Sequence, residues 1–283
     1  MNLSRYTFVL ALACVLTAGE AVKLDTGTGV LYGTVEIPAA KPPYPVVLII
    51  AGSGPTDRDG RLFLQKPDGL PIFAAAADDD QYGPLTETMQ WLISVSKNPE
   101  SRFQRYATGR HGAEMFGPHK DLLDLIAQWF VATLTGHGAL PATNGAAFDA
   151  SIMHTLDRID QPGGAAEVSS DLAQARKRDP HAILFSERIV NLLGYEHLQM
   201  GDTKNAVEIL KLDSAAYPQS PNVYDSLGDA YLADGQRELA LQNAKKALQL
   251  LATDTTDPET RKQQIRESAE QKVKQLEPSA PKK

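Results

Sequence analysis

The stretch NLLGYEHLQMGDTKNAVEILKLDSAAYP (191–218) recurs in altered form as DSLGDAYLADGQRELALQNAKKALQLLA (225–252). Four positions coincide at a single offset of 34 residues: Leu193, Gly194, Gly201 and Ala206 correspond to Leu227, Gly228, Gly235 and Ala240. Small residues let two antiparallel helices approach closely, and a glycine between them permits the chain to reverse. Each copy therefore predicts a helical hairpin, with Gly194 and Ala206, and then Gly228 and Ala240, at the helix contacts.

A period of 34 residues with small residues at these places resembles the tetratricopeptide (TPR) repeat. The predicted repeats cover 187–220 and 221–254, and the highly charged segment 257–275 is expected to form a capping helix. The resemblance implies a short concave surface that could bind a protein or peptide partner. Tyr224 and Tyr231 either line that surface or fill the space between the repeat's own helices, and the second interpretation is favoured.

Upstream of the repeats, residues 71–134 alternate between strand and helix patterns. PIFAAAADDD (71–80) and RFQRYAT (102–108) read as strands, and PLTETMQWLISVSK (84–97) reads as a helix that starts with proline. A second helix is expected after the loop that contains His111, with its apolar stripe formed by Leu122, Leu125, Ile126, Trp129 and Leu134. This order predicts a parallel α/β sheet. The earlier runs VLYGTVEIP (30–38) and VVLIIAGSGP (46–55) also read as strands.

Two consecutive strand–helix units each carry a chemically useful group where the strand ends. Asp78, Asp79 and Asp80 follow the first strand, and His111 lies in the glycine-containing loop after the second. A neutral imidazole can accept a serine proton near pH 7, and a carboxylate can fix its tautomer and stabilise the imidazolium. Considered separately, the three acids could simply cap a helix and His111 could be an ordinary loop residue. The presence of both the acids and the histidine at consecutive strand ends favours a catalytic interpretation.

The order strand–Asp, helix, strand–His, helix resembles the C-terminal half of an α/β-hydrolase of the dienelactone-hydrolase and esterase kind. AADDDQYGP resembles the acid turn of that family, which makes Asp80 the orienting acid and Asp79 the alternate. GRHGAEMF resembles its GGHG loop, with Arg110 in place of the second glycine, and gives His111 the role of general base. GSGPTDRDG (52–60) resembles the loop that forms the oxyanion hole, contributed by Gly52, Ser53 and Gly54. The resemblance implies hydrolysis of a small ester or acyl substrate without a cofactor.

The nucleophile expected in this family is missing from the sequence. No G-x-S-x-G occurs, and the nearest match, AGSGP (51–55), follows a strand but does not lead into a helix. Ser53 is therefore a weak nucleophile candidate, and the chain resembles an α/β-hydrolase that lacks its central, serine-bearing part. Two hypotheses remain open: an ester or acyl hydrolase with a helical repeat domain, or a TPR binding protein whose hydrolase part is inert.

The remaining features restrict the class of protein. A net charge of −7 and a pI near 5.4 argue against a nucleic-acid-binding surface. Residues 1–21 resemble a signal peptide, with a basic residue before an apolar run and small residues at the end, and predict an exported (periplasmic or secreted) protein that leaves the membrane after cleavage. His111, Glu114 and His119 do not have the spacing of a zinc site, so no metal is expected. The predicted organisation is an incomplete α/β domain at 24–134, a linker at 135–145 and an all-α repeat domain at 146–276.

Overall fold

The computed structural model describes residues 20–25, 30–35, 65, 71–81 and 85–277, in two compact units, 1–50 and 51–283. In the first unit, β1 (Glu20–Asp25) pairs antiparallel with β2 (Val30–Val35), in a register that places Glu20 opposite Val35. Strand β2 matches the start of the predicted run 30–38, whereas β1 was not predicted. Most of the predicted signal peptide lies outside the described residues, and cleavage after Ala21 would remove the first two residues of β1.

Among the described residues of the second unit, the first regular element is a two-stranded parallel sheet, as the alternating pattern predicted. Strand β3 (Phe73–Ala77) pairs with β4 (Arg102–Tyr106), and helix α3 (Thr86–Val95) connects them. Side chains of a strand point alternately to its two faces. Accordingly, Ala74 and Ala76 pack with the residues of α3, whereas Phe73, Ala75 and Ala77 pack against the helix that follows β4.

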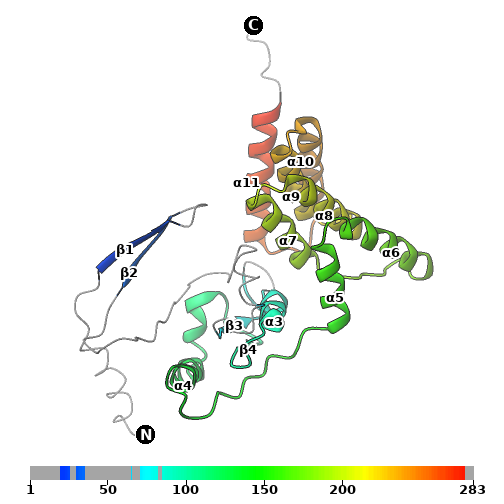
Figure 1. The fold of residues 1–283 in the computed structure, drawn as a ribbon. Helices are drawn as coiled ribbons and strands as arrows, with labels where there is room; N and C mark the ends of the chain where they lie inside the picture. The colour runs from blue at the N-terminus through cyan, green and yellow to red at the C-terminus, as the bar shows by residue number, and fades with distance from the viewer. Residues whose placement is uncertain (1–19, 26–29, 36–64, 66–70, 82–84, 278–283) are drawn as a thin grey trace. The chain divides into compact units, whose positions relative to one another are not determined.

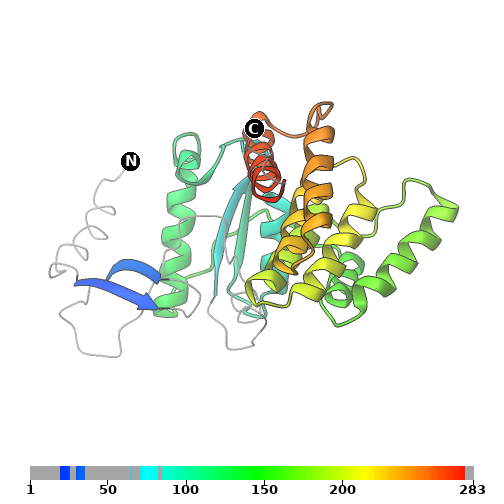
Figure 2. The same cartoon turned by 90° about the horizontal axis from the view of Figure 1, so that it is seen from above.

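That helix, α4 (Asp121–Thr135), covers the second face of the sheet (Figure 2). Leu122 and Trp129 on its predicted apolar stripe are buried, and Ile126 packs beside Leu122. The prediction is wrong for Leu134, which is 41% exposed. Leu134 lies twelve residues after Leu122, about 120° further around the helix, so it falls outside the buried face.

The segment predicted as a linker is fastened to the sheet. The side chain of Asn144 accepts a hydrogen bond from the backbone N–H of Arg105 and donates one to its carbonyl, at 2.8 and 2.9 Å. The N–H of Gly145 donates to the carbonyl of Phe103 at 3.0 Å. These bonds satisfy backbone groups of β4 with which no second strand pairs among the described residues. A side chain at position 145 would collide with Phe103, since a Cβ there would lie 2.5 Å from its carbonyl oxygen.

The rest of the described chain is helical, and its helices stack on one another (Figure 1). The bounds are α5 (Ala150–Ile159), α6 (Gly164–Arg178), α7 (Glu187–Gln199), α8 (Thr203–Ala216), α9 (Pro221–Ala233), α10 (Arg237–Leu251) and α11 (Glu259–Leu276). Helices α7 and α9 begin 34 residues apart, as do α8 and α10. The helical content predicted for this region is confirmed.

The coincident residues of the two hairpins have the local roles that their spacing predicted. Gly201 and Gly235 both adopt φ of +78° at the reversals, a conformation that glycine takes without steric cost. A Cβ at Gly194 would lie 2.6 Å from Leu210, so this glycine lets α7 and α8 approach closely. Ala206 and Ala240 are fully buried. Tyr231 is also buried and packs between the helices of the repeats, as the favoured interpretation predicted.

The largest hydrophobic cluster joins the sheet to the helical region. It contains Ala76 and Phe103 from the strands, Trp91 from α3, and buried residues of α5 to α8 such as Leu156 and Leu193. The two sides of segment 135–145 therefore share one core. In the described part of the chain, no helix combines the length and apolar character needed to cross a bilayer.

A buried histidine ties α5 to the first repeat. His197 is 2% exposed; its Nε2 lies 3.3 Å from Asp160 and its Nδ1 lies 2.9 Å from Asp202. The hydrogen bond with Asp160 raises the pKa of His197, burial opposes the shift, and the bond with Asp202 adds to it.

We expect this histidine to make the stability depend on pH. Because the folded pKa is raised above the unfolded value of about 6.5, the contribution is complete below that value and is lost as pH rises through the folded pKa. Replacing His197 by Asn should cost about 1–3 kcal/mol at pH 6 and should flatten the fall in stability above pH 6.5. Urea unfolding from pH 6 to 9 measures both effects, with the exposed His181→Asn as control. Equal pH slopes in His197→Asn and the wild type would contradict the assignment.

Candidate functional site

The candidate site lies where the two parallel strands end. The acid turn, Asp78–Gln81, follows β3, and the His loop, residues 107–116, follows β4 and ends in the short 3₁₀ helix η1 (Gly112–Phe116). Parallel strands present their carboxyl ends at the same sheet edge, which is where α/β proteins place their sites. Here the β3–β4 pairing brings the acid turn next to the His loop.

Asp80 and His111 are in direct contact. The Nδ1 atom of His111 lies 2.7 Å from Oδ2 of Asp80. The Asp80 side chain is 4% exposed and the His111 side chain 27%, so the carboxylate is enclosed while part of the imidazole reaches the surface. We assign the proton of this bond to Nδ1, with the Asp80 oxygen as its acceptor, which makes Nε2 the acceptor in the neutral ring.

The other residues of the acid turn also contact β4 or the His loop. Asp78 forms an ion pair with the Arg105 guanidinium at 2.8 Å. Asp79, the alternate acid, accepts a hydrogen bond from the backbone N–H of Arg110 at 2.8 Å. Gln81 donates to Glu114 at 3.2 Å. Asp79 therefore fixes the loop backbone next to His111, and the contact with the imidazole belongs to Asp80.

The backbone of the His loop adopts conformations that side chains rarely permit. Gly109 has φ of +147°, and a Cβ there would lie 3.1 Å from both His119 and Met115. Arg110 has φ of +60°, the left-handed region that costs a non-glycine residue roughly 1–2 kcal/mol. The family that the loop resembles has glycine at this position. Arg110 also pairs with Glu114 at 2.8 Å.

His119, the second histidine near the loop, has a packing role. Its ring stacks on Tyr106 with the centroids 3.7 Å apart, and its Nε2 contacts the carbonyl oxygen of Thr108. The Tyr106 hydroxyl donates to Asp121 at 2.9 Å; burial, followed by this hydrogen bond, raises the pKa of Tyr106. Within the described ranges, no group of three or more His, Cys, Asp or Glu side chains is arranged to hold a metal ion.

The other predicted members of the site lie beyond what the structure describes. Gly52, Ser53 and Gly54, predicted as the oxyanion loop with Ser53 as the weak nucleophile candidate, fall among residues 36–64. Their roles stay predictions from the sequence. The packing residues Gly194, Ala206, Gly228 and Ala240 all lie in the repeat hairpins, away from the chemistry.

Contacts from the C-terminal helical region reach the acid turn, which sequence reasoning did not predict. The hydroxyl of Thr260, in the first turn of α11, donates to the backbone carbonyl of Gln81. Nearby, the hydroxyl of Ser186, just before α7, donates to Glu87 of α3 at 2.7 Å. The N-cap residue of α7 and the first turn of α11 thus contact the α/β part of the chain, and the second of these contacts is made at the residue after Asp80.

Arg188, the second residue of α7, lies in a strongly charged environment. Burial lowers its pKa to about 10; the guanidinium of Arg261 acts in the same direction, and Glu187, Asp257 and Asp80 oppose the shift. Arg261 itself is bound by Asp257 at 3.2 Å and by Glu187 at 3.5 Å. Asp80, the last of these influences on the pKa of Arg188, lies more than 100 positions earlier in the chain. No sequence spacing links the two residues.

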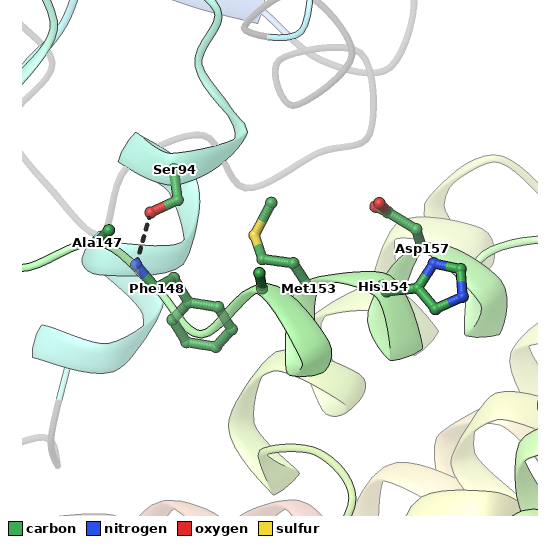
Figure 3. A pocket seen from close by; sticks show the side chains of 7 residues that line it. Ser94, Ala147, Phe148, Met153, His154 and Asp157 are labelled. Atoms are coloured by element: carbon green, nitrogen blue, oxygen red, sulfur yellow. Dashed lines mark hydrogen bonds between the residues drawn. The ribbon is translucent and has the colours of Figure 1, made fainter.

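Two cavities adjoin these elements. One, of about 400 Å³, is lined by Arg188, Glu87, Asp257 and Arg261 together with apolar residues that include Phe185 and Tyr217. The other, of about 420 Å³, lies between α3 and α5; Figure 3 shows Ser94 accepting a hydrogen bond from the Phe148 backbone, with Met153, His154 and Asp157 beyond. Neither cavity is lined by His111 or Asp80.

An enclosed carboxylate bound to a partly exposed imidazole is an arrangement suited to general-base catalysis. The carboxylate selects one tautomer, and that tautomer presents an acceptor nitrogen at the opposite side of the ring. No protein-family model matches the chain, and a search of the curated proteins finds no match. The functional interpretation therefore depends on the geometry of the site and on the residues that form it.

Proposed function

We propose that this chain is an exported ester or acyl hydrolase of the Ser–Asp–His type, related to the α/β-hydrolases, with a C-terminal helical domain of tetratricopeptide type. The single observation that carries the proposal is the 2.7 Å contact between His111 Nδ1 and Asp80 Oδ2 at the carboxyl ends of two adjacent parallel strands. Chain order supports it as well, because the acid precedes the histidine in this family.

In the proposed reaction, Nε2 of His111 takes the proton of a serine hydroxyl while the serine oxygen attacks the ester carbonyl. Asp80 stabilises the imidazolium that forms. The imidazolium then protonates the departing alkoxide as the carbon–oxygen bond of the ester breaks, which leaves an acyl-serine. His111 next takes a proton from a water molecule while the water oxygen attacks the acyl carbonyl. The imidazolium then returns the proton to the serine oxygen as the acyl–serine bond breaks, which releases the acid. Ser53 is the proposed nucleophile, and the backbone N–H groups of Gly52–Gly54 are proposed to stabilise the oxyanion.

The alternative is an inert hydrolase part attached to a binding module. The repeat hairpins favour it, because α7/α8 and α9/α10 share the 34-residue period and α11 packs against α9 and α10 as a terminal helix. A protein or peptide partner would then be the physiological ligand. The hydrolase proposal requires that a serine of the folded protein reacts with an acylating or phosphonylating reagent, whereas the inert binding protein requires no such reaction.

The test is covalent labelling with a fluorophosphonate, followed by mass spectrometry of the adduct. We expect one labelled serine in the wild type, loss of label in Ser53→Ala, and a fall of at least about 10³-fold in rate in His111→Ala. Ser214→Ala is the matched control, because this partly exposed serine bonds only its local helix carbonyl among the contacts described. An unlabelled but folded wild type would support the inert binding protein. If another serine is labelled and its labelling still requires His111, the proposed hydrolase function stands and that serine replaces Ser53 as the nucleophile.

A further inference from the structure

We propose that the cavity lined by Arg188 and by residues of α3, α5 and α11 binds a zwitterionic α-amino acid with an apolar side chain. This site is separate from the Asp80–His111 pair, since neither of those residues lines the cavity. Binding there is therefore independent of the proposed hydrolase function.

The size and the apolar lining of this cavity suit one small molecule. Its volume is about 400 Å³, within the range of roughly 300 to 1,000 Å³ that is typical of ligand sites. Part of its wall is apolar and consists of Ile152, Ile183, Phe185 and Tyr217. The rings of Phe185 and Tyr217 meet edge to face with their centroids 6.2 Å apart, and Ile183 is 60% exposed. The aromatic rings and the uncovered isoleucine favour a ligand with an apolar side chain.

Arg188 supplies a positive charge to this cavity without a bonded partner of its own. Among the described residues, Glu187 and Asp257 attract its guanidinium through space, and no hydrogen bond or ion pair to it is formed. A guanidinium binds a carboxylate through two parallel N–H···O bonds when one lies within reach. The polar part of the cavity therefore offers a place for the carboxylate of a ligand.

The other charges of the cavity wall exclude a ligand that carries only a carboxylate. Arg261 is already held by Asp257 at 3.2 Å and by Glu187 at 3.5 Å, and its side chain is 13% exposed. With Glu87, the wall has three carboxylates and two guanidinium groups, counting Arg188. A purely anionic ligand would meet this surplus of negative charge, which favours a ligand that also carries a positive group.

Glu87 is the lining carboxylate best placed to receive an ammonium group. Its Oε2 accepts the hydroxyl of Ser186 at 2.7 Å, and its other oxygen has no bond among the contacts described. Ser186 comes two residues before Arg188, so Glu87 and Arg188 face the cavity from neighbouring positions, yet the two do not pair with each other. An α-amino acid carries its ammonium and carboxylate on one carbon, so it can bind both residues at once.

The test is isothermal titration calorimetry of the full chain with L-phenylalanine and two analogues at about pH 6.5, where the α-amino group is protonated. L-Phenylalaninamide lacks the carboxylate, and N-acetyl-L-phenylalanine lacks the ammonium group. We expect the wild type to bind L-phenylalanine at least about 10-fold more tightly than either analogue, because each analogue loses hydrogen bonds to a charged group.

Two variants assign the two ends of the ligand. Arg188→Gln should weaken the binding of L-phenylalanine by about 10-fold or more and should bind L-phenylalaninamide no more weakly than the wild type does. Glu87→Gln, whose amide oxygen can still accept the Ser186 bond, should weaken L-phenylalanine and leave N-acetyl-L-phenylalanine unaffected. A merely structural role of either residue would weaken all three compounds alike.

Arg178→Gln in α6 and Glu208→Gln in α8 are the matched controls, because both side chains are exposed and neither lines the cavity. Both should bind all three compounds as the wild type does. If Arg188→Gln does not fold, Arg188→Met replaces it, and Glu87→Gln still tests the ammonium end.

Three results would overturn the proposal. The first is a folded wild type that binds neither L-phenylalanine nor L-leucine at about 10 mM. The second is a wild type that binds either analogue as tightly as L-phenylalanine, since the ligand would then need only one charge. The third is equal binding by the wild type and both variants, which would place the ligand elsewhere on the protein. Fluorophosphonate labelling tests the hydrolase separately, so either proposal can fail alone.

Discussion

Replacing Asp80 with asparagine is expected to lower the fluorophosphonate labelling rate by about 10³- to 10⁴-fold without unfolding the protein. The amide has nearly the shape of the carboxylate, so the turn keeps its contacts. Its neutral group no longer selects the tautomer with the proton on Nδ1, and it no longer stabilises the imidazolium. Labelling rates of the wild type and Asp80→Asn at pH 7 measure the effect, with melting temperatures as the check on folding.

Asp79→Asn is the matched comparison and also decides between the two acids that the sequence left open. Asp79 accepts a bond from the Arg110 backbone, and an amide oxygen can accept the same bond. We expect the labelling rate of Asp79→Asn to stay within about threefold of that of the wild type, because Asp79 does not contact the imidazole. A large loss in Asp79→Asn with little change in Asp80→Asn would assign the acid to Asp79 and contradict the geometry of the pair.

The largest effect on stability is expected from Lys272→Met in α11. Lys272 is 4% exposed, and its ammonium group lies 2.5 Å from Asp229, 2.8 Å from the Ser268 hydroxyl and 3.1 Å from Asp225. Removing one partner of a buried ion pair leaves an uncompensated charge, which costs about 3–5 kcal/mol. The change should therefore destabilise the packing of α11 on α9, measured by urea unfolding at pH 7.

Lys245→Met is the control, because Lys245 forms an exposed pair with Glu277 at 2.7 Å and such pairs contribute at most about 1 kcal/mol. Burial raises the pKa of Asp225 and Lys272 lowers it. Without Lys272, protonation of Asp225 should recover part of the loss, so the deficit should shrink from pH 7 to pH 5. Equal unfolding free energies for the two methionine variants would show that the buried pair contributes no more than the exposed one.

Much of the fold of residues 71–277 was predictable because its signals are local or periodic. The strand that ends at Ala77, the helix that begins at Thr86 and the strand that begins at Arg102 follow from short sequence patterns, and their parallel pairing follows from their alternation. Strand β1 escaped prediction because it overlaps a segment that resembles a signal peptide. Residues 135–145 were predicted as a linker because hydrogen bonds such as that between Asn144 and Arg105 produce no periodic pattern in the sequence.

The candidate site was predictable to the extent that it follows strand ends. Asp80 and His111 each come directly after a strand, and pairing those strands was sufficient to bring them together. From the sequence, Asp80 could be preferred over Asp79 only by its resemblance to the family's acid turn. The contact between His111 and Asp80 in the structure now favours Asp80. The sequence predicted a highly charged capping helix at 257–275, and gave no sign that Lys272 in this helix would be enclosed.

By itself, the sequence determined the helical hairpins, because the steric needs at Gly194, Gly201 and Gly235 are met within one hairpin and recur with its period. It also determined which two strand ends carry an acid and a histidine. Only the tertiary structure decided that Thr260 contacts the acid turn, at the carbonyl of Gln81. The physical reason is that the position of Thr260 depends on how the helices α5 to α11 pack, and no short sequence pattern records that packing.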